Sequence, residues 1–555
     1  MRVRRLRPYL FNGFKRFQRV CPTRPFASFP SLCAADERRD VTHDYEKRVA
    51  QLRAHKSLAG CYPRLPEAFT KKLSSRAFLD SSFEGMKPGD TDTSGHVRMA
   101  GRVRSVRTAG SKLLFIDIQN EEGTLQTVCQ LSKLQEQDDS VTPEAFKAFS
   151  KIIRKGDHFA VVGHVHRTER GENSLLAVAL PQLLSPSLHQ IPERLEDREA
   201  RARSRHVNML VNPDAIRTLR VRHEVEACLQ AFFNDEGFIK VTTPVLGAGA
   251  GGAAARPFET EATELADQKL NLRIAPELWL KRLIVGGMDK IYEIGPAFRN
   301  EGVDATHNPE FNICEFYQAY ATLQDLMNTT ITIIEDLRHR FTWLQGSGAL
   351  TDLPELEILG KDFEQVEFIP GLEERLDCYL PDLQAADAHD KILKIFDDKQ
   401  IPTPSNPTLP RLLDELSAKY LEPLSDKNPI FITNHPACMS PLSKHFVCPK
   451  TSQFVAARAE LFIAGREYAN MYEEENSPFE QRKKFEEQMR QREVDKEAME
   501  LDEGYLRALE WGLPPTGGWG CGIDRLVMLF SGRERMADVL AFGSLRNVVG
   551  LGKTT

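Results

Sequence analysis

The sequence lacks the features that mark membrane-spanning, disulfide-rich and zinc-binding proteins. No stretch approaches the roughly 18 to 20 consecutive apolar residues that a membrane helix requires. The ten cysteines are scattered, without a CxxC pair and without a Cys/His spacing of the zinc type. We therefore expect reduced, mostly structural thiols, no structural zinc and no membrane partner.

An excess of positive charge is also lacking, which excludes a chain that binds nucleic acid over its whole surface. The 73 Lys and Arg residues are outnumbered by 79 Asp and Glu residues, giving a net charge of -6. Any RNA contact must therefore come from local basic patches or from base stacking, and we expect no DNA partner. A chain of 555 residues with 41% hydrophobic and 27% charged residues predicts an ordinary soluble protein of two or more domains.

Acidic residues are absent from the first 35 positions, the first one being Asp36. Eight cations occupy this segment, and its hydrophobic residues are dispersed among them instead of forming the apolar block of a secretory signal. Residues 1–35 thus have the composition of a mitochondrial transit peptide, which predicts a location in the mitochondrial matrix, with the cytoplasm as the alternative. A disordered basic arm that touches RNA is the competing interpretation.

Short alternating strands follow an expected helical extension over residues 36–90. The pattern predicts strands over 96–106, 112–119 and 124–130, a helix over 141–155, and strands over 157–167 and 173–180. Five strands with a helix between the third and fourth is the order of an OB-fold, a small barrel that binds single-stranded nucleic acid on one face. We place this domain at residues 91–185. A small β-barrel without a ligand would show the same order.

A charged linker over residues 186–212 leads into a larger α+β domain, which we place at 213–550. Near its end, Pro478 to Leu509 reads as a long charged helix, and we interpret it as a solvated amphipathic surface. Residues 345–430 carry no pattern to which we assign a function.

The most informative segment covers residues 291–320. Arg299 and Glu301 lie two apart, hence on one face if they belong to a strand, and the chain returns through His307 and Asn308 to Phe311 and a second strand. Such a hairpin holds a cation, hydrogen-bonding groups and an aromatic ring near one nucleotide. The planar fork of arginine suits an α-phosphate, and Phe311 can stack on adenine.

This segment, FRNEG followed by HNPEF, resembles motif 2 of the class II aminoacyl-tRNA synthetases, in the form typical of lysyl-tRNA synthetases. Gly517–Leu526 (GGWGCGIDRL) resembles motif 3, and Gly237–Leu246 (GFIKVTTPVL) resembles motif 1. The resemblance covers nearly everything from His96 to Leu540. It implies an α+β protein, with an N-terminal OB-fold β-barrel that binds the anticodon and a class II synthetase catalytic domain built on an antiparallel β-sheet flanked by helices.

The resemblance also implies roles in the reaction. Arg299 and Arg525 are the expected catalytic residues, and Glu460 and Glu467, seven apart in ELFIAGRE, are the expected ligands of Mg²⁺ as cofactor. Without the flanking motifs these two acids would read as surface residues. The expected ATP-binding set is Arg299, Glu301, His307, Asn308, Phe311, Glu460, Gly522 and Arg525.

Lysine is the amino acid that the resemblance implies. Its ε-ammonium would lie against Glu474 and the hydroxyl of Tyr317, and its α-ammonium against Glu277. A buried ammonium requires an acid, whereas an aspartate pocket would require a cation, and none of the matched positions supplies one. Glu474 stands in a run of three acids, so a solvated side chain is the competing interpretation. The expected lysine-binding set is Gly252, Glu277, Arg299, Tyr317, Asn470, Tyr472 and Glu474.

In the predicted barrel, the resemblance assigns recognition of the tRNA anticodon to Phe115 and Gln126, with Arg107 and Glu172 as further candidates. Phe115 as a plain barrel-core residue is the rival interpretation. Pro244, in the motif 1 segment, is expected at the interface of a homodimer.

Some positions depart from the family pattern. Arg205, His206, Val207 and Asn208 stand where an Arg-Tyr-Leu-Asp run is usual, so a contact at the dimer surface is expected to differ. Ala250 replaces a proline, the loop beyond Gly252 is one residue longer, and Gly543 replaces another proline.

The sequence therefore predicts an enzyme that forms lysyl-adenylate from lysine and ATP and transfers lysine to the 3′ end of tRNA(Lys). An aspartyl- or asparaginyl-type synthetase is the alternative within the enzymes. A catalytically silent tRNA-binding paralogue is the alternative outside them.

Overall fold

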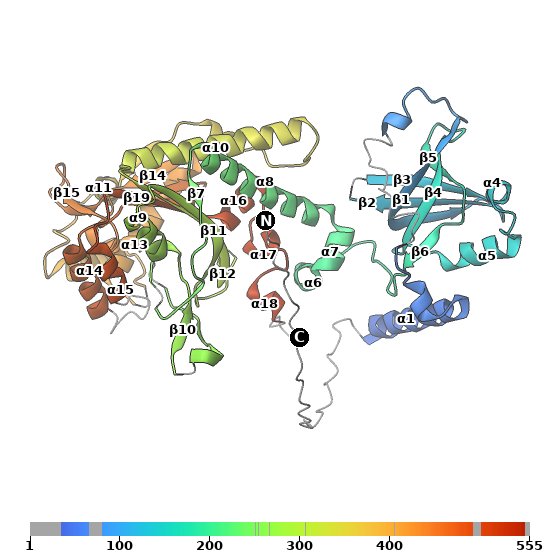
Figure 1. Cartoon of the computed structure of the whole chain (residues 1–555). Coiled ribbons are helices and arrows are strands. Elements are labelled where there is room, and N and C mark those ends of the chain that lie inside the picture. The colour runs from blue at the N-terminus through green and yellow to red at the C-terminus, as the bar shows by residue number, and fades with distance from the viewer. Residues whose placement is uncertain are drawn as a thin grey trace, which may run out of the picture. The chain divides into compact units, whose positions relative to one another are not determined.

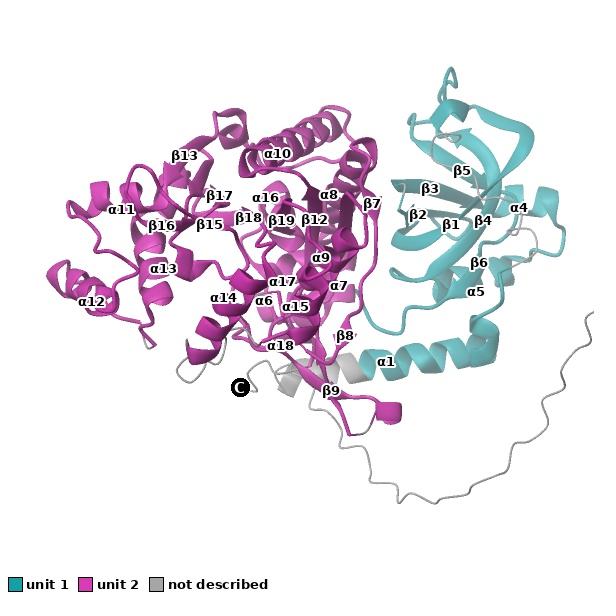
Figure 2. Cartoon of the chain, turned by 60° about the vertical axis from the view of Figure 1, so that its left-hand side comes forward, with its two compact units in different colours: residues 1–191 teal, residues 192–555 magenta. Residues whose placement is uncertain are grey.

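The computed structural model describes residues 35–65, 80–121, 123–249, 251–252, 255–265, 267–305, 307–404, 406–491 and 501–549. The expected transit peptide, except for its last residue, and Ala250 lie outside the described residues, as do parts of the segments 36–90 and 478–509. The chain divides into two units, residues 1–191 and 192–555 (Figure 2).

Unit 1 contains the expected barrel. β1 pairs with both β2 and β4, and the pairs β2–β3, β3–β5 and β5–β4 complete a ring of strands around a core that includes Leu114 and Ile116. The order of strands with helices between the third and fourth confirms the OB-fold (Figure 1). Its elements are β1 (Thr91–Thr108), β2 (Leu113–Asn120), β3 (Gly123–Gln130), α4 (Leu131–Gln137), α5 (Pro143–Ile152), β4 (His158–Arg167), β5 (Asn173–Ala177) and β6 (Gln182–Ser185).

Helix α1 (Ala35–His55) is fastened to this barrel by a buried ion pair. Nη2 of Arg48 donates to Oδ2 of Asp157 at 2.7 Å, and its Nη1 donates to the carbonyl of Ile152 at 2.7 Å. Both charged side chains are almost fully buried. Burial raises the pKa of Asp157, and the Arg48 guanidinium opposes this rise. The pair therefore balances two charges that water does not reach.

Unit 2 is built on an eight-stranded sheet in the order β13-β14-β17-β18-β19-β12-β11-β7. Its central neighbours are antiparallel, and only the edge strands β13 and β7 pair in parallel. The strands are β7 (Ile239–Lys240), β11 (Lys290–Phe298), β12 (Glu310–Ala319), β13 (Glu364–Glu367), β14 (Ile430–Thr433), β17 (Arg458–Ile463), β18 (Arg466–Glu473) and β19 (Thr516–Gly522). This arrangement confirms the predicted fold class.

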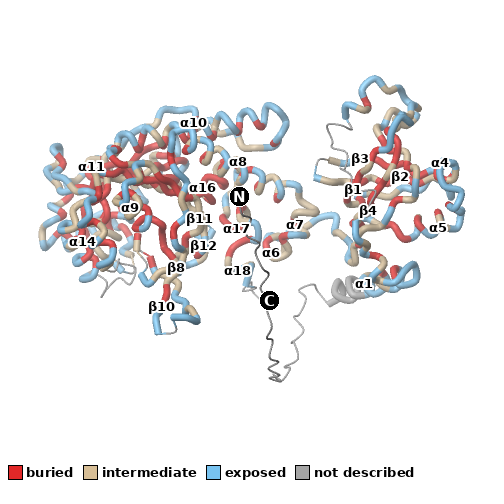
Figure 3. The backbone as a smooth tube through the Cα atoms, in the orientation of Figure 1, coloured by how far each residue is buried: buried red, intermediate tan, exposed pale blue. Residues whose placement is uncertain are grey.

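One face of this sheet is covered by the helices α8 (Pro213–Asp235), α10 (Leu323–Gly346) and α16 (Ile523–Ser531), which enclose the main hydrophobic core (Figures 1 and 3). The remaining helices are α6 (Arg198–Arg203), α7 (Arg205–Val211), α9 (Glu277–Val285), α11 (Phe368–Leu376), α12 (Ala388–Asp398), α13 (Leu409–Tyr420), α14 (Pro478–Gln491), α15 (Glu503–Leu509), α17 (Met536–Val539) and α18 (Leu545–Val548). The short strands outside the large sheet are β8 (Leu246–Gly247), β9 (Glu259–Glu261), β10 (Lys269–Leu272), β15 (His445–Val447) and β16 (Phe454–Ala456). None of the described helices is long and apolar enough to cross a membrane.

Helix α14, part of the segment interpreted as a solvated amphipathic surface, has one exposed side and one buried side. One side of this helix is buried, including Gln481, Lys484 and Phe485. Phe485 packs with Tyr505 of α15. The high charge of the segment concealed this inner side, because Lys484 is buried together with its own counter-ion.

Two positions near the departures from the family pattern have defined surroundings: Arg205 keeps the usual arginine, and Gly543 replaces a proline. Arg205 is buried, and its guanidinium donates to the carbonyls of Asp538 and Ala541 at 2.8 and 3.3 Å, so it contacts its own chain. Gly543 adopts a φ of 78°, which the proline ring cannot reach because it fixes φ near -65°. The backbone at residue 543 therefore excludes the proline that is common there.

Replacing Arg48 with methionine should loosen unit 1, because Asp157 would stay buried without its cation. Removing one partner of a buried ion pair lowers the free energy of unfolding by about 3 kcal/mol or more. We expect amide hydrogens of β1 and β4 to exchange roughly 100-fold faster in the full chain, measured by mass spectrometry. Arg53→Met, at an exposed position of the same helix, is the control, and Arg48→Met/Asp157→Asn should recover part of the loss. Unchanged exchange in Arg48→Met would contradict this account.

Candidate active site

The strands of unit 2 separate core residues from site residues by their alternation. On β12, Cys314 and Phe316 belong to the hydrophobic core, whereas Glu315 and Tyr317 line a cavity on the other face. Successive side chains of a strand point to opposite faces, so a polar residue at every second position forms a polar floor. β18 repeats the pattern, with Met471 in the core and Tyr472 in the cavity.

The strand register joins these residues into two rows across the sheet. Tyr317 pairs with Gly518, Gly518 with Tyr472, and Tyr472 with Arg458. The adjacent row consists of Glu315, Gly520, Asn470 and Glu460. Glycines occupy the β19 position in both rows, which leaves the middle of the floor bare and gives the cavity its depth.

The cavity has a volume of about 1100 Å³. It brings together nearly all of the residues that the sequence predicted for lysine, ATP and metal, although they come from elements far apart in the chain. The predicted residues that line it are Gly252, Glu277, Arg299, Glu301, His307, Asn308, Phe311, Tyr317, Glu460, Glu467, Asn470, Tyr472, Gly522 and Arg525.

Glu474 is the exception, since it lies directly behind the cavity wall. Its side chain is 0% exposed and forms an ion pair through Oε2 with Nζ of Lys281, which is also 0% exposed. The same Nζ lies 2.5 Å from Oε1 of Glu277, and the Tyr472 hydroxyl donates to that oxygen at 2.7 Å. Burial raises the pKa of the Glu474 carboxyl above its usual range, and the Lys281 ammonium acts in the opposite direction. Two acids and one cation thus share the closed end of the cavity.

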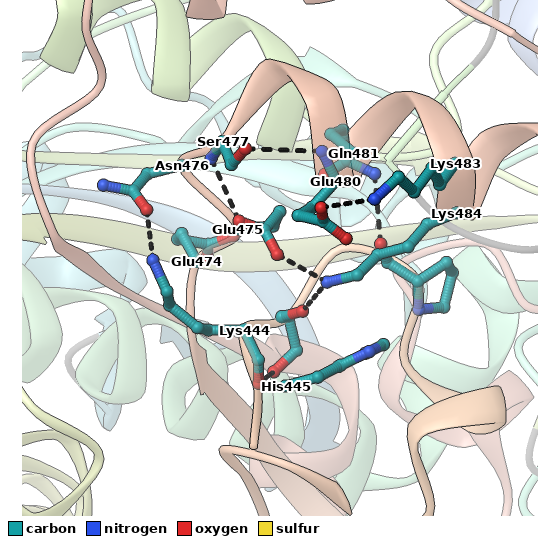
Figure 4. Close-up of polar contacts among 12 residues, drawn as sticks. Lys444, His445, Glu474, Glu475, Asn476, Ser477, Glu480, Gln481, Lys483 and Lys484 are labelled. Carbon is teal, nitrogen blue, oxygen red and sulfur yellow. Dashed lines mark hydrogen bonds and ion pairs between the residues drawn. The ribbon is translucent and has the colours of Figure 1, made fainter. Parts of the chain in front are cut away.

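The three consecutive acids Glu473, Glu474 and Glu475 have three different partners. Oε1 of Glu473 accepts a hydrogen bond from the backbone N–H of Leu323 at the start of α10. Glu475 forms an ion pair with Lys484 of α14 at 2.7 Å (Figure 4). Only Glu474 adjoins the cavity end, and its burial excludes the interpretation as a solvated acid.

Gly518 is required by the position of Glu474. A Cβ atom added at Gly518 would lie 1.9 Å from Oε1 of Glu474 and 2.6 Å from Cε1 of Tyr317. Atoms cannot approach so closely, so any side chain at residue 518 would displace the acid or the tyrosine. The second glycine of the GGWGCG run therefore fixes the closed end of the cavity.

Glu315 is a further acid in the cavity that the sequence analysis did not select. It is buried, and the Tyr317 hydroxyl donates to its Oε2 at 3.3 Å. Burial, together with the charge of Glu277, raises the pKa of Glu315 to about 8. At neutral pH this carboxyl is therefore mostly protonated, and the ammonium of Lys281 contacts Glu277 and Glu474 instead.

In a second part of the cavity, the hairpin of β11 and β12 contributes Arg299 and Phe311 to the lining. The strand β11 ends at Phe298, so Arg299 and Glu301 lie just beyond it and not on a regular strand face. The N–H of Arg299 donates to the carbonyl of Pro309 at 2.8 Å, which holds the two sides of the hairpin together. The guanidinium carbon lies 5.2 Å from the ring centroid of Phe311, and the buried Nε has no hydrogen-bond partner. A cation beside an aromatic ring suits a nucleotide phosphate and its base.

A bulge in β18 brings Glu467 to the face that carries Glu460. Leu461 pairs with Ala469, but the next residue, Phe462, pairs with Glu467, so Tyr468 is an extra residue in β18. Such an insertion reverses the alternation on one side of it. Without the bulge, Glu467 and Asn470, three residues apart, would point to opposite faces.

Each of the two acids contacts a cation. Arg525 donates through Nη1 to Oε2 of Glu467 at 2.9 Å. Glu460 forms a close ion pair with Arg458 and contacts Nε2 of His435 at 3.0 Å. Burial by itself would raise the pKa of Glu460, but Arg458 and His435 lower it to about 2. Glu460 is therefore ionised at every physiological pH.

Sequence reasoning missed Lys281, Glu315 and Arg458, and it also missed the part that residues 408–422 play in the cavity wall. A cation does stand at this end of the cavity, because Lys281, which is not among the matched positions, supplies one from α9. A signal was present, since Lys281 follows Glu277 by four residues and one helical turn brings such a pair together. Asp414 and Glu422 line the cavity from a segment to which we had assigned nothing.

In unit 1, the four candidate anticodon residues lie on β1, β2, β3 and the turn before β5. Phe115 is half-buried and is not part of the barrel core, which takes its neighbours Leu114 and Ile116. Arg107 pairs with Phe115 across the strands, with its guanidinium carbon 6.0 Å from the ring centroid. Nε2 of Gln126 donates to Glu172 at 3.1 Å. The rival interpretation of Phe115 as a core residue is therefore wrong.

Comparison with known families gives two matches along the chain. Residues 197–546 match the tRNA synthetases of class II (D, K and N). Residues 97–180 match an OB-fold nucleic acid binding domain.

Similar proteins from several organisms are lysine–tRNA ligases by name. The mitochondrial lysine–tRNA ligase of Schizosaccharomyces pombe is 40% identical over 455 residues, covering 81% of this chain and 84% of that protein. The lysine–tRNA ligases of Aquifex aeolicus and Enterococcus faecalis are 38% and 37% identical, covering 81% of this chain and 73% and 87% of those proteins. The chain therefore belongs to the class II tRNA synthetases, within the lysine–tRNA ligase family, and is an ATP-dependent aminoacyl-tRNA ligase.

Proposed function

We propose that this protein activates lysine with ATP to form lysyl-adenylate and then transfers lysine to the 3′ end of tRNA(Lys). The observation that carries the choice of lysine is the charge at the closed end of the cavity. The ammonium of Lys281 contacts both Glu277 and Glu474, and with both acids ionised the group would have a net charge of -1. One further ammonium neutralises the group, whereas the carboxylate of aspartate would add a second uncompensated negative charge.

The proposed activation step depends on positioning and electrostatics. An oxygen of the lysine carboxylate attacks the α-phosphorus of ATP, and pyrophosphate leaves with the electron pair of the broken P–O bond. Arg299, with its buried unpaired Nε, and Arg525, at the first turn of α16, would stabilise the added negative charge. Asn470, Gly252 and Tyr472 would orient the amino acid, and Phe311, Glu301, His307, Asn308 and Gly522 would hold the nucleotide.

Mg²⁺ bound with ATP is part of this proposal. Glu460 and Glu467 line the cavity, and the described residues contain no group of three or more His, Cys, Asp or Glu side chains that could hold a metal. Two carboxylates fit Mg²⁺, which usually keeps several waters and takes phosphate oxygens beside one or two protein ligands. When bound there, the ion would neutralise charge on the phosphates. Arg458 and His435 would keep Glu460 ionised for this role.

The face of the barrel that carries Phe115 is the proposed site for the tRNA anticodon. The half-exposed ring beside Arg107 offers a base-stacking surface with a cation at its edge. Gln126 and Glu172, which are already hydrogen-bonded to each other, would present donor and acceptor atoms to base edges.

A mitochondrial location and a homodimer complete the proposal. The composition of residues 1–35 and the similarity to a mitochondrial relative support the first, although other relatives are bacterial or, by name, cytoplasmic. Exposed Pro244, next to the short edge strand β7 with exposed Ile239, supports the second.

ATP/pyrophosphate exchange tests the substrate, because lysine alone should support it, while aspartate and asparagine should not. Replacing Glu474 with glutamine should lower kcat/KM for lysine about 100-fold, since removing one charge of a buried ion pair costs about 3 kcal/mol. Glu473→Gln is the matched control and should leave kcat/KM for lysine near the wild-type value, because its acid faces α10. Exchange supported by aspartate, or an unimpaired Glu474→Gln enzyme, would refute the assignment.

Gly518→Ala should have a comparable effect, because its Cβ would displace Glu474 or Tyr317. We expect kcat/KM for lysine to fall about 100-fold, as for loss of the acid itself. Gly520→Ala, on the same face of β19, meets protein atoms only at 3.4 Å or beyond and should raise KM for lysine far less. Equal KM values for lysine in the two variants would count against the steric argument.

Fusing residues 1–35 to a fluorescent reporter should direct it to mitochondria, as judged by overlap with a matrix marker. Exchanging Arg4, Arg5, Arg7 and Arg16 for glutamine removes half of the cations in this segment and should leave the reporter in the cytosol. A diffuse signal from the unaltered segment would contradict the mitochondrial proposal.

A further inference from the structure

Lys281 is a buried cation that no step of the proposed reaction uses. Its ammonium lies 2.5 Å from Oε1 of Glu277 and forms an ion pair with Oε2 of Glu474. The rings of Tyr472 and Tyr505 stand 5.6 and 5.9 Å from the same nitrogen. A fully buried lysine with two carboxylate partners needs an explanation, because burying an ammonium is costly.

The ammonium of Lys281 does not occupy the space that a ligand would take. Glu277, Tyr317 and Tyr472 line the cavity, whereas Lys281 does not. It reaches the two acids from α9, one helical turn after Glu277, and its side chain is fully buried without lining the cavity. Oε1 of Glu474 keeps no hydrogen-bond partner among the described residues. Lys281 can thus stay in place while a substrate binds.

Two buried carboxylates that are close enough to share one ammonium cannot both be ionised without a cation. Their mutual repulsion and their burial raise the pKa of one of them, so that the pair holds a proton. A lysine substrate arriving at such a pair would have to release that proton before its ammonium could bind. Its affinity would then fall with falling pH.

We propose that Lys281 is a built-in counter-ion, which keeps Glu277 and Glu474 ionised in the empty pocket so that the ammonium of lysine binds without displacing a proton. This inference rests on the proposed function, because it takes lysine as the substrate. Lys281 is a positioning residue in this scheme, since it acts on the substrate through the two acids.

The titratable and charged groups around the pair come from four elements and the residue that follows β18. They are Lys281 and Glu277 of α9, Glu315 and Tyr317 of β12, Tyr472 of β18 with Glu474 after it, and Tyr505 of α15. Among the groups beside the pair, Glu315 is the one with a pKa near neutral, and burial is the main cause of its rise to about 8.

The test is the number of protons released when lysine binds to the full-length protein. Isothermal titration of L-lysine at pH 7 in buffers with different ionisation enthalpies gives this number. Lys281→Met should release about one proton more than the wild type, because its two acids share a proton until lysine arrives. Its dissociation constant should also rise up to about tenfold, relative to the wild type, for each pH unit below the pKa of the pair.

Two further variants keep this test decisive. Lys281→Arg retains the cation and should return the proton count to the wild-type value. Glu315→Gln, with Lys281 intact, removes the proton that Glu315 could contribute. Lysine binding to this variant should therefore release close to no protons. This variant answers the question even if Lys281→Met does not fold.

An unchanged proton count in folded Lys281→Met, or release of about one proton by Glu315→Gln, would overturn the inference. A merely structural role of Lys281 would weaken lysine binding equally at every pH and would leave the proton count unchanged. Normal lysine-dependent exchange, together with an unchanged proton count in Lys281→Met, would refute the counter-ion role of Lys281 and leave the proposed function intact. Absence of lysine binding to the wild type would refute the proposed function and this inference with it.

Discussion

The site of this protein depends on a balance of buried charge. Two carboxylates, Glu277 and Glu474, meet one ammonium, Lys281, at a place that water does not reach. Two buried carboxylates with a single cation leave one negative charge uncompensated, which is unfavourable. Binding of one further cation therefore stabilises this group most. In the proposed function, selectivity for lysine then follows from the sign of the missing charge. The tyrosines around the group exclude solvent and so strengthen each of these contacts.

The sheet makes this arrangement possible because its single layer separates the hydrophobic core on one face from the polar cavity on the other. The same strands supply Phe316, Met471 and Trp519 to the core and polar residues to the cavity. Packing against α8, α10 and α16 holds the strands in register, so the core fixes the positions of charged groups it never touches. The rows of paired residues across β12, β19, β18 and β17 are therefore as rigid as the core behind them.

Much of this architecture could be predicted from the sequence. Alternation gave the barrel strands, and the Gly-rich and FRNE segments located the hairpin and the strand that form the cavity floor. Contacts between distant segments could not be predicted where no family motif marks the residues. No sequence pattern near Lys281 indicates that Glu474 is its partner. The buried side of α14 was not recognised because it includes a charged residue, Lys484, which is neutralised by Glu475. Charge patterns read along the chain do not distinguish a solvated lysine from a buried, neutralised one.

The extra residue Tyr468 in β18 has a consequence for comparing relatives of this chain. Because the bulge turns Glu467 toward Glu460, the hairpin of β17 and β18 cannot lose one residue and keep both acids in the cavity. A homologue that is shorter by one there would direct its acid into the hydrophobic layer, whatever the alignment suggests. For keeping both acids in the cavity, the length of this hairpin is thus as diagnostic as the identity of the two glutamates.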